Sequence, residues 1–115
     1  MNVLVDTNIL VYRQDCSEPA KRRVAGQTLR ALFRAGAAAA TPQVLAEYSV
    51  TVRRKWPERL DRATIVAEIE FLVAACDVLP LDATVSIAAA HASARYDMHF
   101  YDAQIWAAAK VHGVP

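Results

Sequence analysis

Three acidic side chains in this chain have the types and positions that could bind a metal ion. Asp6 follows a short apolar run, Glu47 lies about one turn into a predicted helix, and Asp102 lies at the start of the last predicted helix. Open α/β sheets bind ligands at the carboxyl ends of their strands and at the helices that begin there. Three carboxylates without basic partners would repel one another unless a cation lay between them. Because Mg²⁺ and Mn²⁺ prefer carboxylate and water oxygens, the pattern predicts a divalent metal site that could activate water and stabilise charge on a phosphate.

Each of these acids also has a purely structural interpretation. Asp6 could cap the next helix, Glu47 could face solvent, and Asp102 could complement the dipole of its helix. Apolar residues surround Glu47 and follow Asp102, and this pattern favours a shared site over three unrelated roles.

The elements that must position the acids alternate between strand and helix. Short apolar runs that end in turn-forming residues predict strands over residues 2–5, 37–40 and 77–81. A helix is expected to begin just after Asp6, and apolar residues at helical spacing predict further helices over residues 19–36, 42–56, 65–76, 83–96 and 101–112. This order predicts an α/β fold, a single domain over residues 1–115 in which a parallel sheet lies between two layers of helices (α/β/α).

The composition limits the classes of protein that remain. The chain has 115 residues, 13 basic and 12 acidic, with a formal net charge of +1, which excludes a polybasic nucleic-acid tail. Its longest stretch without charge, residues 35–46, is shorter than the roughly 20 residues that a membrane-spanning helix needs, so we expect no membrane partner. Cys16 and Cys76 form no CxxC pair, and we expect both thiols to be reduced in a cytoplasmic protein.

Three sequence motifs, in this order and spacing, resemble those of one family. They are VLVDTN over residues 3–8, TPQVLAE over residues 41–47 and FYDAQIWAAA over residues 100–109. Together they resemble a PIN domain of the VapC toxin type, and the resemblance covers essentially the whole chain. It implies a PIN-like fold, a metal-dependent ribonuclease activity, and a role as the toxin of a VapBC-type toxin-antitoxin pair. It further implies a homodimer that a cognate VapB-like antitoxin restrains.

The resemblance also assigns roles to residues. It implies that Asp6, Glu47 and Asp102 are catalytic acids that bind Mg²⁺ or Mn²⁺, and that Thr7 or Asn8 orients them. The implied reaction is hydrolysis of an RNA phosphodiester by a metal-activated water, with the acids as ligands only. Family members usually carry a further strand and a fourth acid after the last helix found here, so we expect that strand to be missing from this chain. A catalytically impaired PIN-like binding module is therefore the alternative function.

Two surfaces could contact the partners that the resemblance implies. The RNA backbone needs positive charge, which Arg53, Arg54 and Lys55 could supply, or else residues 21–23 and Arg30; solvated helix faces are the alternative interpretation of both groups. The helical hairpin over residues 41–76 carries more apolar residues than one sheet face obviously needs, so it could bind the antitoxin, or its apolar residues could belong to the core.

Overall fold

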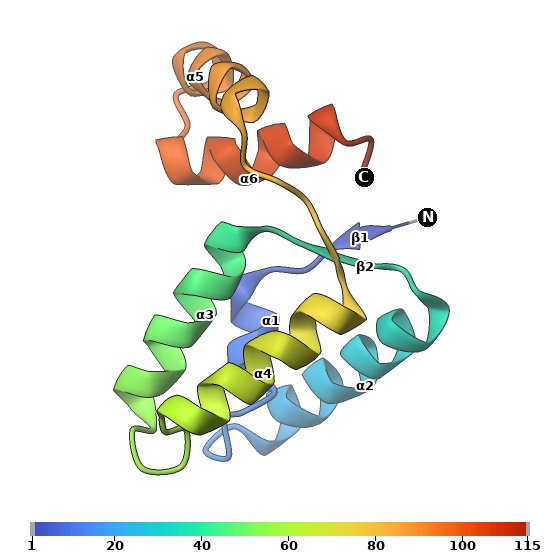
Figure 1. Ribbon diagram of the computed structural model, residues 1–115, viewed down its shortest axis with the longest axis vertical. Helices are drawn as coiled ribbons and strands as arrows, with labels where there is room; N and C mark the ends of the chain where they lie inside the picture. The colour runs from blue at the N-terminus through green and yellow to red at the C-terminus, as the bar shows by residue number, and fades with distance from the viewer. Residues whose placement is uncertain (1, 115) are drawn as a thin grey trace.

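A computed structural model of the chain describes residues 2–114 (Figure 1), so the expected domain ends at residues 1 and 115 lie outside the described residues. The elements in chain order are β1 (Val3–Leu4), α1 (Thr7–Tyr12), α2 (Pro19–Ala35), β2 (Ala38–Ala40), α3 (Pro42–Lys55), α4 (Arg62–Ala75), β3 (Asp77–Val78), α5 (Ala83–Tyr96) and α6 (Phe100–Val111). The alternation predicted from the sequence is confirmed.

The three strands form one parallel sheet in the order β1-β2-β3, and they are shorter than expected. Val3 pairs with Ala38, and Ala40 pairs with Val78. The predicted third strand to residue 81 is wrong in length because Pro80 has no N–H to continue the ladder. The apolar run of the first strand suggests burial on both faces, as in a parallel sheet, but Val3 in β1, an edge strand of the described sheet, is 44% exposed.

Helices cover both faces of this sheet, as the α/β/α prediction requires. Figure 1 shows α1 to α4 on one side of the strands and α5 with α6 on the other. Ala38 and Ala40 join the large core beneath α1 to α4, whereas Ala39 packs with Leu79 and Val114 near α6. Alternate residues of β2 thus serve opposite layers, and their small side chains leave room for helices on both sides.

Local capping explains where several helices begin and end. Thr41 accepts a hydrogen bond from the Val44 N–H, and Pro42 lies in the first turn of α3. Asp82 caps α5 in the same way. At the other end of α2, Gly36 adopts a φ of +62°, a left-handed conformation that suits glycine and stops the helix.

The hairpin of α3 and α4 uses its apolar face for the core. Tyr48, Val52 and Leu72 are all fully buried in the cluster beneath the sheet, so the core interpretation of these positions is confirmed. Val73, by contrast, is exposed. An antitoxin surface on this hairpin would consist of outward-facing residues and would exclude Tyr48, Val52 and Leu72.

The lengths of the helices and the state of the two cysteines bear on membranes and disulfides. None of the helices that the structure describes is long and apolar enough to cross a membrane. Both cysteines are free thiols: Cys16 is exposed and Cys76 is buried. Burial, together with the nearby charge of Asp77, raises the pKa of the Cys76 thiol.

Candidate functional site

Asp6 lies where the chain leaves β1 and enters α1. It occupies the N-cap position of that helix, with an extended backbone (φ −82°, ψ 149°), yet its side chain makes no capping hydrogen bond. The carboxylate is exposed. The capping interpretation of the Asp6 side chain is therefore wrong, and this carboxylate has no structural task in the first turn of α1.

Glu47 is held by two donors from different parts of the sequence. The Thr7 hydroxyl donates to Glu47 Oε2 at 3.0 Å, and Gln43 Nε2 donates to Glu47 Oε1 at 3.0 Å. The first bond crosses from α1 to α3, and Thr7 directly follows Asp6. The first two motifs are therefore in direct contact through a side chain that the sequence singled out.

The same glutamine connects the third motif. Gln43 Nε2 also lies 3.5 Å from the carbonyl oxygen of Tyr101, the residue before Asp102 in the first turn of α6. Gln43 Oε1 is buried and has no hydrogen-bond partner within the described part of the chain. Gln43 thus bridges α3 and the start of α6, a contact that its place in the second motif does not predict.

The core beneath α3 fixes where Glu47 points. Its neighbour Tyr48 is fully buried, and the Tyr48 hydroxyl accepts a hydrogen bond from Gln14 Nε2 at 3.1 Å. Burial and then the negative charge of Glu68 raise the pKa of Tyr48, so the phenol stays neutral. With Tyr48 anchored inward, the adjacent Glu47 side chain faces the start of α1.

The carboxylate oxygens of Asp6, Glu47 and Asp102 are suitable ligands for a hard divalent cation. Asp6, Glu47 and Asp102 take part in no salt bridge within residues 2–114, where the ion pair present joins Arg13 to Glu68. Oxygen ligands without competing cations are what Mg²⁺ and Mn²⁺ require. However, no three His, Cys, Asp or Glu side chains in the described range lie close enough together to hold a metal ion. The three carboxylates are therefore of the right type to bind Mg²⁺ or Mn²⁺, but their side chains do not lie close together in this structure.

Comparison with known proteins identifies the family. Residues 3–115 match the sequence model of the PIN domain. The chain belongs to the PIN domain family. PIN domains are generally nucleases, and PIN nucleases typically use divalent metals. No curated protein matches the chain.

One solved structure similar to this PIN domain is described as a toxin-antitoxin complex from Klebsiella pneumoniae. The two chains superpose with a TM-score of 0.71 at 19% sequence identity, over 98% of this chain and 82% of the other. At this level of identity the similarity establishes the fold, which agrees with the parallel sheet and flanking helices described above.

The predicted basic residues of the PIN domain lie at the far end of the helix that carries Glu47. Arg53, Arg54 and Lys55 form the last turn of α3, about 9–12 Å along the helix axis from Glu47. They complement the negative end of the helix dipole there, and the Lys55 ammonium lies 5.8 Å from the centre of the Trp56 ring. This placement agrees with a structural role, and a contact with RNA remains a prediction.

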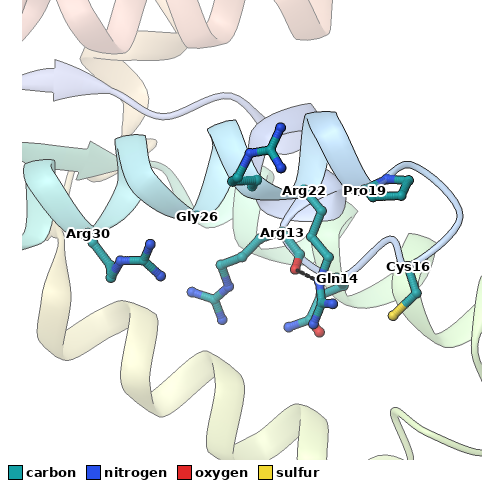
Figure 2. Close-up of a pocket in the computed structure, with 8 residues that line it drawn as sticks. Arg13, Gln14, Cys16, Pro19, Arg22, Gly26 and Arg30 are labelled. Atoms are coloured by element: carbon teal, nitrogen blue, oxygen red, sulfur yellow. Dashed lines mark hydrogen bonds between the residues drawn. The ribbon is translucent and has the colours of Figure 1, made fainter.

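A separate cavity of about 550 Å³ collects arginines between the end of α1 and α2 (Figure 2). Arg13, Arg22, Arg23 and Arg30 line it, together with Gly26. Arg13 is neutralised by Glu68 at 2.6 Å, and Arg22 Nε donates to the Arg13 carbonyl oxygen at 3.2 Å. None of the three predicted acids lines this cavity. The α2 arginines, which could have flanked the acids, therefore form a different surface.

No pattern in the sequence indicates a role for Arg13 or Gln43 in these surfaces. Positions 22, 26 and 30 share one face of α2 by their spacing of four residues, and that signal was readable. Arg13 joins them from another element, and Gln43 meets Tyr101 across 58 positions, so only tertiary structure shows these contacts. Of the two residues expected to orient the acids, Thr7 makes such a bond, and the Asn8 side chain forms none within the described residues.

Proposed function

We propose that this PIN domain is a metal-dependent endoribonuclease that acts as the toxin of a VapBC-type toxin-antitoxin pair. One observation carries the proposal: hydrogen bonds of Thr7 and Gln43 converge on Glu47 and reach Tyr101, so the three acid-bearing motifs lie together. Membership of a family of nucleases supports the reaction class. The description of a similar fold as part of a toxin-antitoxin complex supports the biological role.

The residues of this chain would divide the work between ligation and positioning. Asp6, Glu47 and Asp102 would hold Mg²⁺ or Mn²⁺, and the bound ion would supply an activated water and stabilise charge on the phosphodiester. The acids serve as ligands, so no side chain acts as a nucleophile. Thr7 and Gln43 orient Glu47 by donating to its two oxygens. The exposed carboxylates of Asp6 and Asp102 must turn toward Glu47 to complete the ligand set.

The proposed substrate and partners follow from the same role. The RNA is single-stranded or looped at the cut, because an A-form duplex hides its bases in a deep, narrow groove. Arg53, Arg54 and Lys55 are proposed contacts for its backbone. A VapB-like antitoxin restrains the toxin, which forms a homodimer in the cytoplasm. The two free thiols support a reducing compartment.

A second candidate function has its own supporting observation. Since no three ligating side chains are gathered among residues 2–114, the domain could bind RNA or protein without cleaving RNA. Such a PIN-like binding module would keep the fold and the Thr7–Glu47 contact. It would differ from the nuclease by failing to bind Mn²⁺ at the three acids.

Cleavage of labelled structured and single-stranded RNAs tests the proposal on the full chain. We expect cutting with Mg²⁺ or Mn²⁺ that EDTA abolishes, and at least hundredfold less cutting by Asp6→Asn or Asp102→Asn, since the ion would lose one of its three carboxylate ligands. The matched control is Glu70→Gln, which removes an exposed acid of α4 outside the site. If the wild type neither cuts RNA nor binds Mn²⁺ by paramagnetic resonance, the binding module is correct. Equal cutting by Asp6→Asn would contradict the assigned ligands.

A further inference from the structure

The hairpin of α5 and α6 presents a row of two adjacent exposed rings with a cation beside each, formed by Arg95, Tyr96, Trp106 and Lys110. Tyr96 is 55% exposed and Trp106 is 38% exposed. Their ring centres lie 6.0 Å apart, with the planes inclined by 64°. The Arg95 guanidinium lies 5.3 Å from the Tyr96 ring and the Lys110 ammonium 5.5 Å from the Trp106 ring.

A hollow beside the row leaves room for a planar group. It has a volume of about 220 Å³, and its lining includes Ala88, Ala92, Tyr96 and Trp106. The two alanines contribute little bulk, so a flat ligand could enter between the helices and contact the rings. An aromatic wall over a floor of small residues suits a nucleobase, because every base has a face that can stack.

The row is held on a stiff support. Buried alanines of both helices pack against one another, which brings α5 and α6 close together. The Ser93 hydroxyl donates to the carbonyl oxygen of Met98 at 2.6 Å, across the turn that connects the helices. The rings of Tyr96 and Trp106 are therefore positioned before any ligand arrives, which lowers the entropic cost of stacking.

The row also leads toward the candidate active site. Asp102, Trp106 and Lys110 are four residues apart along α6, so they lie on one face of that helix at steps of about 6 Å. A strand that stacks a base on Trp106 and pairs a phosphate with Lys110 would continue along the same face to Asp102. A nucleic acid could thus reach the acids without turning around the helix.

We propose that this row is a binding track for single-stranded RNA, which stacks bases on Tyr96 and Trp106 and pairs phosphates with Arg95 and Lys110. The delivery of that RNA to Asp102 rests on the proposed nuclease function, whereas the binding itself needs no metal. Base stacking is tolerant of sequence, so the track supplies affinity and direction, and the cleavage position is chosen elsewhere.

Charge favours RNA over a second copy of this chain as the occupant. In a two-fold dimer the same patch faces itself, which would bring the Arg95 and Lys110 cations of both copies together. The row contains no acid to compensate these cations, so their repulsion would oppose the contact. Phosphates, in contrast, complement both cations.

Tryptophan fluorescence tests the track directly, because Trp56 and Trp106 are the two tryptophans of the chain. In Trp56→Phe protein with EDTA present, a short unlabelled single-stranded RNA of mixed sequence should quench Trp106 in a saturable way. Adding Tyr96→Ala should weaken binding about tenfold, as expected for loss of one stacked base. Phe71→Ala, which removes an exposed ring of α4, is the matched control and should leave affinity unchanged.

Salt dependence provides a second measurement that a purely structural role would not change. Replacing both Arg95 and Lys110 by Gln should reduce the slope of log affinity against log salt by about 1.4, since each phosphate contact to a single strand contributes about 0.7. Circular dichroism must show that each variant has the melting temperature of its parent. A variant that does not is replaced by Trp106→Phe and Lys110→Gln, whose RNA binding is measured by the anisotropy of a labelled RNA.

Several results would overturn the track. These are no quenching in folded Trp56→Phe protein, unchanged affinity in Tyr96→Ala, or self-association that shields Trp106 from acrylamide, which would mean that a second copy covers the face. The proposed function can fail separately: quenching by RNA without any metal-dependent cleavage keeps the track and removes the nuclease. Cleavage without quenching keeps the nuclease and removes the track.

Discussion

The hydrogen bond from Thr7 to Glu47 offers a sharp test of the candidate site, because it connects two motifs 40 positions apart at 3.0 Å. Thr7→Val keeps the shape of the side chain and removes the donor, whereas Thr7→Ser keeps the donor. Hydrogen bonds to charged groups contribute about 1.5–3 kcal/mol when they are shielded from water. Glu47 is exposed, so water replaces part of the lost bond, and we expect a coupling of about 0.5–1 kcal/mol.

A double-mutant cycle with Glu47→Ala isolates that coupling from other effects of each change. Urea unfolding of the metal-free protein measures it, and the corresponding difference in melting temperature is about 2–4 °C. If Thr7 also orients Glu47 as a ligand, Thr7→Val should weaken Mn²⁺ binding about twofold to fivefold, and Thr7→Ser should keep most of the affinity.

A coupling of zero within error would show that the Thr7–Glu47 bond does not contribute to stability. Thr7→Val would then destabilise the wild type and the Glu47→Ala protein equally, so its effect would come from packing at the start of α1. A loss of Mn²⁺ affinity that is equal in Thr7→Val and Thr7→Ser would likewise contradict an orienting role for the hydroxyl.

Three further predictions test how the structure supports the site. Val52→Asp should unfold the protein or lower its free energy of unfolding by about 4 kcal/mol or more in urea melts, because Val52 is 0% exposed. The control, Val50→Asp at a 66% exposed position, should change that free energy little. Equal free energies of unfolding for the two variants would contradict the placement of Val52 in the core. Thr41→Ala should cost about 1 kcal/mol through loss of the α3 cap, measured in the same way, with Thr41→Ser restoring most of it. A thiol reagent near pH 8 should modify Cys16 quickly and Cys76 only slowly, because burial raises the Cys76 pKa and lowers its thiolate fraction. Mass spectrometry at a series of rising pH values should show that the modification rate of Cys76 increases after that of Cys16. Similar rates at pH 8 would show that Cys76 is accessible.

Much of the fold was readable because its signals are local. A short strand followed by Thr41 and Pro42 predicts a capped helix, and the structure has that cap and that helix. Alanine favours helix, but the alanine run over residues 37–40 lies between Gly36 and Pro42 and is long enough only for a strand, as observed. The ends of the strands were less predictable, because they depend on which neighbouring strand offers backbone hydrogen bonds. The exposed side chain of Val3 in the edge strand β1 is an example.

The candidate site was readable in part. The sequence indicated Asp6, Glu47 and Asp102 by residue type and by their places after strands or at helix starts. It left open whether Asp6 caps α1, and the structure shows that its side chain does not. It also left open which hairpin residues serve the core, and burial of Tyr48 and Val52 decided that question.

Local patterns thus predict the order of strands and helices and the layers that they form, because periodicity, capping and strand ends depend on residues close together in the chain. The same patterns indicate Asp6, Glu47 and Asp102 as candidate ligands, and their role stays a prediction. The contacts of Thr7 with Glu47 and of Gln43 with Tyr101, and the cavity that Arg13 forms with the arginines of α2, appear only in the folded chain. These contacts depend on how whole helices pack against the sheet. That packing sums many weak contacts between residues far apart in the chain, and no local pattern encodes it.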